Sequence, residues 1–516
     1  MRLGVRFVLL MSILLLVSCG GKEPAVKPAN PAIRVQLKEV DAFRARFEVS
    51  TIETASVRYG VGTTESEARE MGQSVRTEDS RTSTFTLTIE NLLQDTDYIL
   101  CAQGTGPAGE EGSVVKLEFS TPAGPSGLYS WEKARDAVPE FADISLITRG
   151  QHNYNPPLWT AERFAPHVSY QDADGEHWLF DAFLCTEGYD GVRGLTMSIQ
   201  AGGRASAIKE SWEELLDYWF RKGSTLDQLD QAVSAAASRI GNPHTPRYVV
   251  ITLPDPIMFQ NFSNKASSTT YWGTLDGEVM DFSRLEHQLK VYQWFIDQCR
   301  ERFRALSPKY LELAGFYVLS EELPLAKSFY DSLGLSCDTA DTWNAAYKRW
   351  ESILPATAAY LKSCREGLYW IPYFCAPGHR VWKQLGFDMA WMQPNHYWDT
   401  ANQHPMSRSV SAMRNYGLGM ELEFEYSMVY DQMKNGRWGP DGAGIPTFTE
   451  ADIPALRDRL REYMNAFKDN GFYGKRSVAL YSGTDAFTQL GTSPDARDRE
   501  MYLEICNFIA GSELKK

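Results

Sequence analysis

The sequence lacks the residues and motifs that would identify metal, phosphate or thiol chemistry. Its eight cysteines are scattered and none belongs to a CxxC pair, which argues against a zinc site and a disulfide framework. The Walker-type phosphate loop, the HExxH zinc motif and the GxSxG nucleophile motif are all absent. A formal net charge of −14 argues against binding to nucleic-acid phosphates. We therefore expect no cofactor, no metal and no nucleic-acid partner.

Aromatic residues, in contrast, are plentiful, with 14 Trp, 25 Tyr and 25 Phe among 516 residues. Aromatic rings fill protein cores, and they also stack on the apolar faces of sugar rings. Most of these rings are expected in the core, because a chain of this length has room for two or three domains. The remainder would suit a surface that binds carbohydrate.

The amino-terminal segment has the pattern of a bacterial lipoprotein signal. Arg2 and Arg6 precede an apolar run over residues 7–17, which has the length of a signal-peptide core and is too short to span a membrane. The residues LVSC that end at Cys19 resemble a lipobox, in which the cysteine becomes lipidated. We expect a signal peptide over residues 1–18, a tether over residues 19–32 and a lipid anchor in the outer membrane or at the cell surface. The alternative is an ordinary cleaved signal with a chance cysteine.

Replacing Cys19 by Ala should release the protein from membranes, because alanine cannot carry a lipid. Membrane fractionation and metabolic lipid labelling of the wild type and the variant measure this. If the variant still fractionates with membranes and the wild type takes up no lipid label, the lipoprotein interpretation is wrong.

A small β domain is predicted next. Residues 33–121 contain strand-like runs with alternating polarity, separated by turn residues, which is typical of a β-sandwich. Leu92, Thr96 and Tyr98 resemble the tyrosine-corner segment of fibronectin type III domains. We interpret the domain as a spacer rather than as a glycan-binding module, since a fold alone does not give a function. Residues 122–127, rich in Pro and Gly, are expected to form an interdomain linker.

Residues 128–516 show buried strands that alternate with amphipathic helices, the pattern of an α/β domain. Eight parallel strands predict a (β/α)8 TIM barrel. The connection between the fifth and sixth strands is short, which leaves an open doubly wound sheet as the alternative. The predicted strands are residues 144–148, 178–184, 248–253, 313–319, 368–374, 388–392, 419–425 and 477–481.

Polar and aromatic residues lie at or near the carboxyl ends of most of these strands, where a TIM barrel has its active site. Saccharide sites need apolar ring faces beside hydrogen-bonding groups. Among the candidates we expect Trp398 to contact sugar and Trp391 to serve packing. The predicted substrate-binding residues are Arg149, His152, Asp181, Trp391, Gln393, Asn395, His396, Tyr397 and Trp398.

Two strands also deliver carboxylates. Residues 313–322 read LAGFYVLSEE, and residues 419–426 read GMELEFEY. In the second segment a period of two places Glu421, Glu423 and Glu425 on one face of the strand. A pair of carboxylates that face each other can act as acid, base or nucleophile on a glycosidic bond. Glu421 lies deeper along the strand and is expected to pair with a base such as Arg149.

The second domain resembles the domain-of-unknown-function family 4855, which is found in secreted bacterial proteins and is similar to the barrel glycoside hydrolases. The resemblance covers roughly residues 130–512, and the run GFDMAWMQPN at residues 386–395 is its most specific part. It implies a barrel that acts on carbohydrate, with catalytic residues at the ends of the fourth and seventh strands. Ser320 precedes Glu321, where many retaining barrel glycosidases have Asn before the acid. The segments that carry the resemblance are residues 315–317, 369–374 with Gly378, 386–395 and 419–424.

We expect a glycoside hydrolase that acts on an oligosaccharide or polysaccharide by a retaining, two-glutamate mechanism. Glu321 is assigned as the general acid/base and Glu423 as the nucleophile, with Glu322 and Glu425 as the alternatives. The competing hypothesis is a non-catalytic glycan-binding or scaffold lipoprotein. A binder needs aromatic platforms but no opposed pair of acids, so the two acid-bearing strands favour the enzyme.

Overall fold

The computed structural model divides the chain into two compact units, residues 1–124 and residues 125–516. Each unit is described by itself. The described residues are 30–40, 45–89, 92, 96–122, 138–148, 158–198, 205–261, 264–337, 348–399, 401–433, 448–483 and 485–515. Cys19, Arg149 and His152, together with most of the predicted tether and most of the predicted linker, lie outside them.

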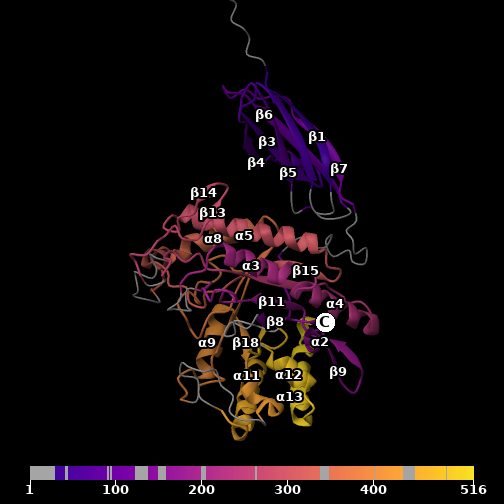
Figure 1. The fold of residues 1–516 in the computed structure, drawn as a ribbon, viewed down its shortest axis with the longest axis vertical. Coiled ribbons are helices and arrows are strands. Elements are labelled where there is room, and N and C mark those ends of the chain that lie inside the picture. Colours follow the sequence, from indigo (N-terminus) through magenta and orange to yellow (C-terminus); the bar gives the residue numbers. More distant parts are fainter. Residues whose placement is uncertain are drawn as a thin grey trace, which may run out of the picture. The chain divides into compact units, whose positions relative to one another are not determined.

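The first unit is a pair of antiparallel sheets, as predicted for a β-sandwich (Figure 1). Phe47 and Val49 from one sheet and Leu100 and Phe119 from the other are buried in a common core. Tyr98 of the predicted tyrosine corner is also buried, and its ring stacks on Phe119 with centroids 5.6 Å apart. One sheet has the order β1 (Ala32–Val40), β2 (Ala45–Ile52), β5 (Thr82–Ile89), and the other has the order β4 (Gln73–Arg76), β3 (Ser56–Gly62), β6 (Asp97–Thr105), β7 (Val115–Ser120); α1 (Glu65–Ala68) follows β3.

The second unit contains a closed barrel of eight strands in which neighbouring strands are parallel. The strands coincide in order with the eight predicted ones, and closure excludes the open doubly wound sheet. In order around the barrel they are β8 (Asp143–Thr148), β11 (Ala182–Thr186), β12 (Arg247–Leu253), β15 (Leu311–Val318), β16 (Gly367–Trp370), β17 (Met389–Met392), β18 (Gly419–Glu423) and β19 (Val478–Tyr481).

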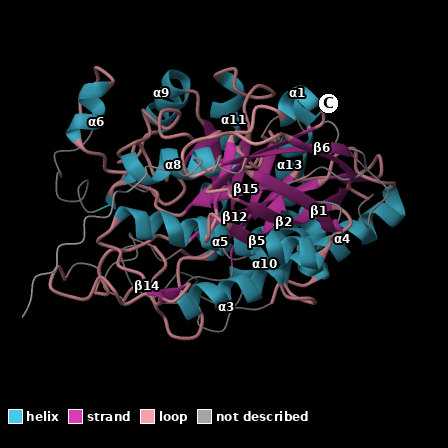
Figure 2. Ribbon diagram, turned by 90° about the horizontal axis from the view of Figure 1, so that it is seen from above, coloured by secondary structure: helices cyan, strands magenta, loops and turns pink. Residues whose placement is uncertain are grey.

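Helices lie on the outside of the barrel (Figure 2). The connection between β16 and β17 consists of turns, in keeping with its short length. None of the helices in the described ranges is both long enough and apolar enough to cross a membrane. They are α2 (Ala161–Val168), α3 (Lys209–Phe220), α4 (Thr225–Ile240), α5 (Leu285–Leu306), α6 (Lys327–Ser332), α8 (Trp350–Lys362), α9 (Met406–Tyr416), α10 (Tyr430–Met433), α11 (Ile453–Asp469), α12 (Ala486–Thr492) and α13 (Ala496–Ala510).

Short elements complete the unit. They are the hairpins β9 (Ser169–Gln171) with β10 (Glu176–Trp178) and β13 (Thr274–Leu275) with β14 (Glu278–Val279), and the 3-10 turns η3 (Tyr426–Met428), η4 (Glu450–Asp452) and η5 (Glu513–Lys515).

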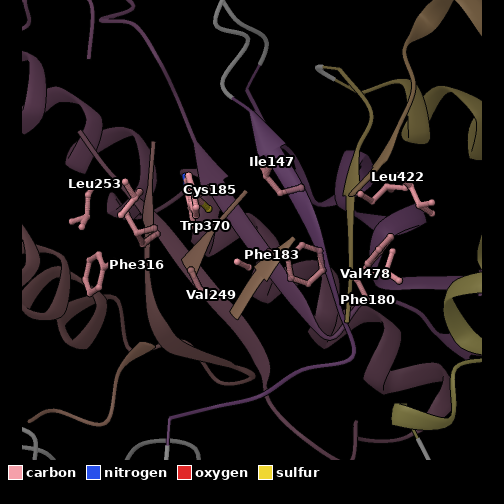
Figure 3. Close-up of a cluster of buried hydrophobic side chains, with 14 of the residues drawn as sticks. Ile147, Phe180, Phe183, Cys185, Val249, Leu253, Phe316, Trp370, Leu422 and Val478 are labelled. Atoms are coloured by element: carbon pink, nitrogen blue, oxygen red, sulfur yellow. The ribbon is translucent and has the colours of Figure 1, made fainter. Parts of the chain in front are cut away.

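Side chains of the barrel strands alternate between two apolar layers. The outward-facing set, which includes Phe183, Val249, Phe316 and Leu422, packs in the layer between strands and helices (Figure 3). The inward-facing set fills the barrel interior and is completed by Phe141, which stacks on Trp391 with centroids 6.0 Å apart. Inward members are Ile144, Leu146, Ala182, Leu184, Val250, Tyr317, Tyr369, Trp391 and Ala479.

An ion pair closes the amino end of the barrel. The Lys515 ammonium lies 2.8 Å from Asp143 Oδ2 and 3.5 Å from Asp181 Oδ1, and Asp181 also pairs with Arg247 at 2.9 Å. Asp143 is 1% exposed, and burial raises the pKa of its carboxyl to about 7 against the opposing effect of Lys515. A buried carboxylate that loses its only nearby ammonium is strongly destabilising.

We predict that Lys515→Met lowers the free energy of unfolding of the barrel by about 3 kcal/mol at pH 8, because Asp143 must then either stay charged without this partner or take up a proton against the pH of the solution. The deficit should shrink towards pH 5. The folded-state pKa of Asp143 lies above its unfolded value of 3.8, so acid protonates it in the folded state first and removes the need for a counter-charge. Chemical denaturation at both pH values measures this, with Lys475→Met at an exposed position as the control. Equal losses in the two variants would contradict the prediction.

Candidate active site

The face of β18 that carries glutamates points into the barrel. Met420 and Leu422 pack in the outer layer, so alternation directs Glu421 and Glu423 inward. Glu423 is fully buried and Glu421 is 2% exposed. Burial raises the pKa of both carboxyls, and each is further raised by neighbouring acids. The described charges that act on Glu421 are those of Glu423 and Glu321, and its predicted partner Arg149 lies outside the described residues.

Glu423 is held by two hydrogen-bond donors to the same oxygen. The Tyr463 hydroxyl donates to Oε2 at 2.7 Å, and the backbone N–H of Asn395 donates at 2.6 Å. Asn395 has a left-handed backbone with φ 52°, a conformation that asparagine tolerates better than most residues. Within the described residues Oε1 has no hydrogen-bond partner. The carboxylate is therefore fixed through one oxygen and has acceptor capacity left on the other.

Tyr463 organises the loop after β17 as well as the carboxylate. This fully buried residue of α11 also accepts hydrogen bonds from the backbone N–H groups of His396 and Tyr397, both at 2.8 Å. Its hydroxyl thus makes three hydrogen bonds. No local pattern in α11 distinguishes it from a core tyrosine, which is why the sequence did not single it out.

Glu321 follows the end of β15 and is partly buried. Burial, with a smaller effect from the charge of Glu322, raises the pKa of its carboxyl to about 7. Its backbone carbonyl accepts from the N–H of Tyr373, at 3.1 Å, and the carbonyl of Ser320 accepts from the indole of Trp370, at 2.7 Å. Glu322 is exposed. The two adjacent glutamates therefore differ in environment, and only Glu321 has the properties of a tuned acid.

The two predicted catalytic glutamates lie within electrostatic reach of each other, since the charge of Glu321 raises the pKa of Glu423. Backbone contacts link the loops that lead from one to the other. After the Glu321–Tyr373 bond, the N–H of Gln393 donates to the carbonyl of Pro372 at 2.9 Å, and Asn395 then contacts Glu423. The loops after β15, β16 and β17 thus form a connected rim that ends at the nucleophile candidate.

Glu425 lies one step further along β18, beyond the strand end, and is partly buried. Burial raises the pKa of its carboxyl to about 7, opposed by hydrogen-bonding groups of Trp398 and Tyr481. Burial raises the pKa of Tyr481 well above its ordinary value, and the charges of all four neighbouring glutamates add to the rise. The site is therefore a cluster of carboxyl groups around a partly buried tyrosine, set at the carboxyl end of the barrel.

The predicted sugar-binding residues of the loop after β17 divide into two groups. Gln393 and Asn395 lie beside Glu423, and Trp398 is partly exposed with its ring 6.0 Å from that of Tyr481. His396 pairs through Nε2 with Glu462 of α11 at 2.6 Å. The first group is placed to meet a substrate at the cluster.

Three predicted contacts lie elsewhere. Asp181 precedes β11 and belongs to the ion-pair group at the amino end of the barrel, so its assignment to the substrate site is wrong. The strand begins at Ala182, later than residue 178 as predicted, and that shift moves Asp181 to the opposite end. Trp391 is buried in the inner core, as expected for a packing residue, and Tyr397 is fully buried with its hydroxyl 2.9 Å from Ser427. Neither ring is presented to a ligand.

Within the described part of the chain, no group of three or more His, Cys, Asp and Glu side chains could hold a metal ion.

The comparisons with known proteins concern both units. A family model described as "Domain of unknown function (DUF4855)" matches residues 143–438. No curated protein matches the chain. The β-glucuronidase of Bifidobacterium dentium complexed with coumarin-3-O-glucuronide is 9% identical with a TM-score of 0.31, over 88% of this chain and 61% of that one. The β-glucuronidase of Lactobacillus rhamnosus is 10% identical with a TM-score of 0.28, over 87% and 60%.

For a shorter part of the chain, the sensor domain of the anti-sigma factor RsgI4 from Pseudobacteroides cellulosolvens is 19% identical with a TM-score of 0.15, over 19% of this chain and 97% of that one. The chain spans about 60% of the length of the two β-glucuronidases. Scores this low carry no functional conclusion.

We predict that Tyr463→Phe lowers the free energy of unfolding by about 2 kcal/mol, because it leaves three buried hydrogen-bonding groups without their shared partner. The ring is preserved, so the core keeps its shape. Thermal unfolding measures the loss, and Tyr473→Phe, which removes a half-buried hydroxyl that donates to the carbonyl of Phe508 at 2.7 Å, is the control. A loss no greater than in the control would contradict a central role for the Tyr463 hydroxyl.

Proposed function

The chain belongs to the DUF4855 family, and we propose that its barrel is a glycoside hydrolase with a retaining, two-glutamate mechanism. The observation that carries the proposal is the pairing of two tuned carboxyl groups, Glu321 and Glu423, from the ends of β15 and β18. Glycoside hydrolysis requires two carboxyl groups of this kind in different protonation states. The family description names no activity, so the site alone supports the assignment.

The environments of the two glutamates support different roles. Burial raises the pKa of Glu423 to about 8, and the two hydrogen bonds that Glu423 accepts on Oε2 oppose that rise. One carboxyl group of the pair must ionise for the reaction, and these two hydrogen bonds favour ionisation at Glu423, which suits a nucleophile. Glu321 has a pKa raised to about 7 by burial, so it still carries its proton in much of the population at neutral pH. That is the requirement for a general acid. Burial raises the pKa of Glu421 well above its ordinary value, and the charges of Glu423 and Glu321 add to the rise.

The reaction follows from these roles. Glu321 gives its proton to the glycosidic oxygen as the bond to the anomeric carbon breaks, while Glu423 Oε1 attacks that carbon and forms a glycosyl ester. Glu321, now ionised, takes a proton from water, and the resulting hydroxide oxygen attacks the same carbon and releases Glu423. The proton that Glu321 gives to the leaving alcohol is replaced from water, and Glu423 regains its negative charge when the ester is broken, so the cycle closes without a cofactor.

Neighbouring groups supply the substrate contacts. Gln393 and Asn395 offer amide groups beside the nucleophile, and Trp398 offers a partly exposed ring next to Glu425. Glu322 and Glu425 remain the substitutes for the two catalytic positions. The lipobox at Cys19 supports a location on a bacterial membrane, where a lipid anchor would hold the hydrolase near extracellular glycans.

We predict that Glu423→Gln lowers kcat by at least about 10³-fold and that Glu321→Gln lowers it by about 10²–10⁴-fold on substrates with poor leaving groups. Dinitrophenyl glycosides should partly rescue Glu321→Gln, since their leaving group needs no proton. With wild type the rate should follow a bell-shaped pH profile set by the coupled pair, in which the pKa values of Glu321 and Glu423 are raised to about 7 and about 8, and Glu321→Gln should lose the alkaline limb. Initial rates from pH 4 to 10 on a panel of aryl glycosides and polysaccharides measure all three effects.

Glu312→Gln is the matched control, because it changes a glutamate at the amino end of the same strand β15. It should retain the rate and the pH profile of the wild type. Normal turnover by Glu321→Gln or Glu423→Gln would refute that residue's assignment and direct attention to Glu322 or Glu425. Tight glycan binding without turnover by the wild type would support the non-catalytic alternative.

A further inference from the structure

Tyr373 is linked by hydrogen bonds to both proposed catalytic residues, directly to Glu321 and through Asn395 to Glu423. Its backbone N–H donates to the carbonyl of Glu321 at 3.1 Å. Its hydroxyl accepts from Asn395 Nδ2 at 3.2 Å, and the backbone N–H of the same asparagine contacts Glu423. One side chain thus separates the tyrosine hydroxyl from the nucleophile.

The phenol of Tyr373 is also within electrostatic reach of the carboxylates. The charges of Glu423, Glu321 and Glu322 add to the effect of burial and raise the pKa of Tyr373. The residue is only partly buried, in contrast to Tyr463, which is fully buried and donates to Glu423. Tyr373 is therefore a partly accessible hydroxyl between the acid and the nucleophile.

The tautomer of His404 sets whether the Tyr373 hydroxyl donates its proton to the imidazole. Its Nε2 lies 3.0 Å from the Tyr373 hydroxyl, and its Nδ1 lies 3.9 Å from Asp399 Oδ2. The ring packs edge-on against Phe374 with centroids 4.6 Å apart, and Asp399 also accepts the backbone N–H of His404 at 2.5 Å. Within the described residues Nδ1 has no hydrogen-bond partner, and the Asp399 carboxylate acts on it through its charge, which favours the tautomer with the proton on this nearer nitrogen. Nε2 is then an acceptor, and Tyr373 donates its only proton to it.

Counting hydrogen bonds gives the remaining capacity of the hydroxyl. A tyrosine hydroxyl has one proton and two acceptor sites. The proton goes to His404 and one acceptor site is filled by Asn395. One acceptor site is left, so the group can bind only a ligand that donates a hydrogen bond.

We propose that Tyr373 binds a donating hydroxyl group of the sugar at the cleavage site and that His404 is the positioning residue that holds Tyr373 as an acceptor. This inference rests on the proposed hydrolase function and adds a requirement to it. The enzyme needs a sugar with a free hydroxyl at the contacted ring position, and it discriminates against sugars in which that position carries fluorine or hydrogen.

The test compares wild type, Tyr373→Phe and the control Tyr473→Phe as full chains. The substrates are α- and β-4-nitrophenyl glycosides of glucose, galactose, mannose, xylose and N-acetylglucosamine, followed by the monodeoxyfluoro forms of the sugar that is turned over fastest. Tyr373→Phe should lose about tenfold in kcat/KM on the parent sugar, the value of one hydrogen bond. On one deoxyfluoro sugar, kcat/KM of the wild type should fall by a similar factor relative to the parent sugar. For Tyr373→Phe, kcat/KM should be the same on that sugar as on the parent. Tyr473→Phe should match wild type throughout.

His404 is tested by a pair of substitutions. His404→Gln offers a side-chain oxygen as acceptor and should retain the discrimination between parent and deoxyfluoro sugar, whereas His404→Phe preserves an aromatic ring without an acceptor and should lose it. Equal discrimination in both variants would overturn the role of His404. Wild-type kinetics in Tyr373→Phe, or an equal loss on every deoxyfluoro sugar, would overturn the role of Tyr373.

Parallel assays of Glu423→Gln separate this inference from the function it rests on. If Glu423→Gln is inactive but the losses caused by Tyr373→Phe and by the deoxyfluoro sugar add, the hydrolase proposal stands and the Tyr373 contact is wrong. If Glu423→Gln is active and Tyr373 discriminates between the parent and deoxyfluoro sugars as predicted, the contact stands and Glu423 is not the nucleophile. If no glycoside is turned over, saturation-transfer NMR with the same glycosides decides: binding that Tyr373→Phe loses supports the contact, and equal or absent binding overturns it.

Discussion

A carboxyl group buried inside a barrel is the constraint to which the rest of the candidate site responds. Glu423 is fully buried, and an uncompensated charge at such a position would cost several kcal/mol. The Tyr463 hydroxyl and the Asn395 N–H offset that cost at one oxygen. Because Tyr463 also accepts two N–H groups of the following loop, the same hydroxyl that stabilises the charge determines the path of the chain after β17.

This arrangement explains why the functional groups occupy successive loops. The loops after β15, β16 and β17 are joined by backbone hydrogen bonds, and two of these bonds, from Tyr373 to Glu321 and from Gln393 to Pro372, lie beside the carboxyl cluster. A displacement of one loop therefore moves Glu321, Tyr373 or Glu423 relative to the others. The proposed catalysis depends on the distances between these groups, so the connected rim would serve that chemistry as well as the fold.

Much of the fold could be predicted, because strand alternation and buried runs are local signals. The eight barrel strands were found in order, and the glutamates of β15 and β18 were placed at the ends that carry the site. Asp181 was misplaced because an error of a few residues in a strand boundary exchanges the two ends of a barrel. Tyr463 was not identified because its partners are far away in the sequence. Tyr397 and Trp398 are neighbours, and only packing decides which of the two is buried.

Closure of the barrel has a consequence for how the chain folds during its synthesis. β8, the first barrel strand to be made, pairs on one side with β19, the last, and Asp143 at its start is neutralised by Lys515 from a still later segment. During synthesis an emerging barrel therefore exposes an open sheet edge and an unpaired buried acid until its final elements are available. Until then the growing chain depends on other means, such as chaperone binding, to avoid joining its open edge to that of a neighbour.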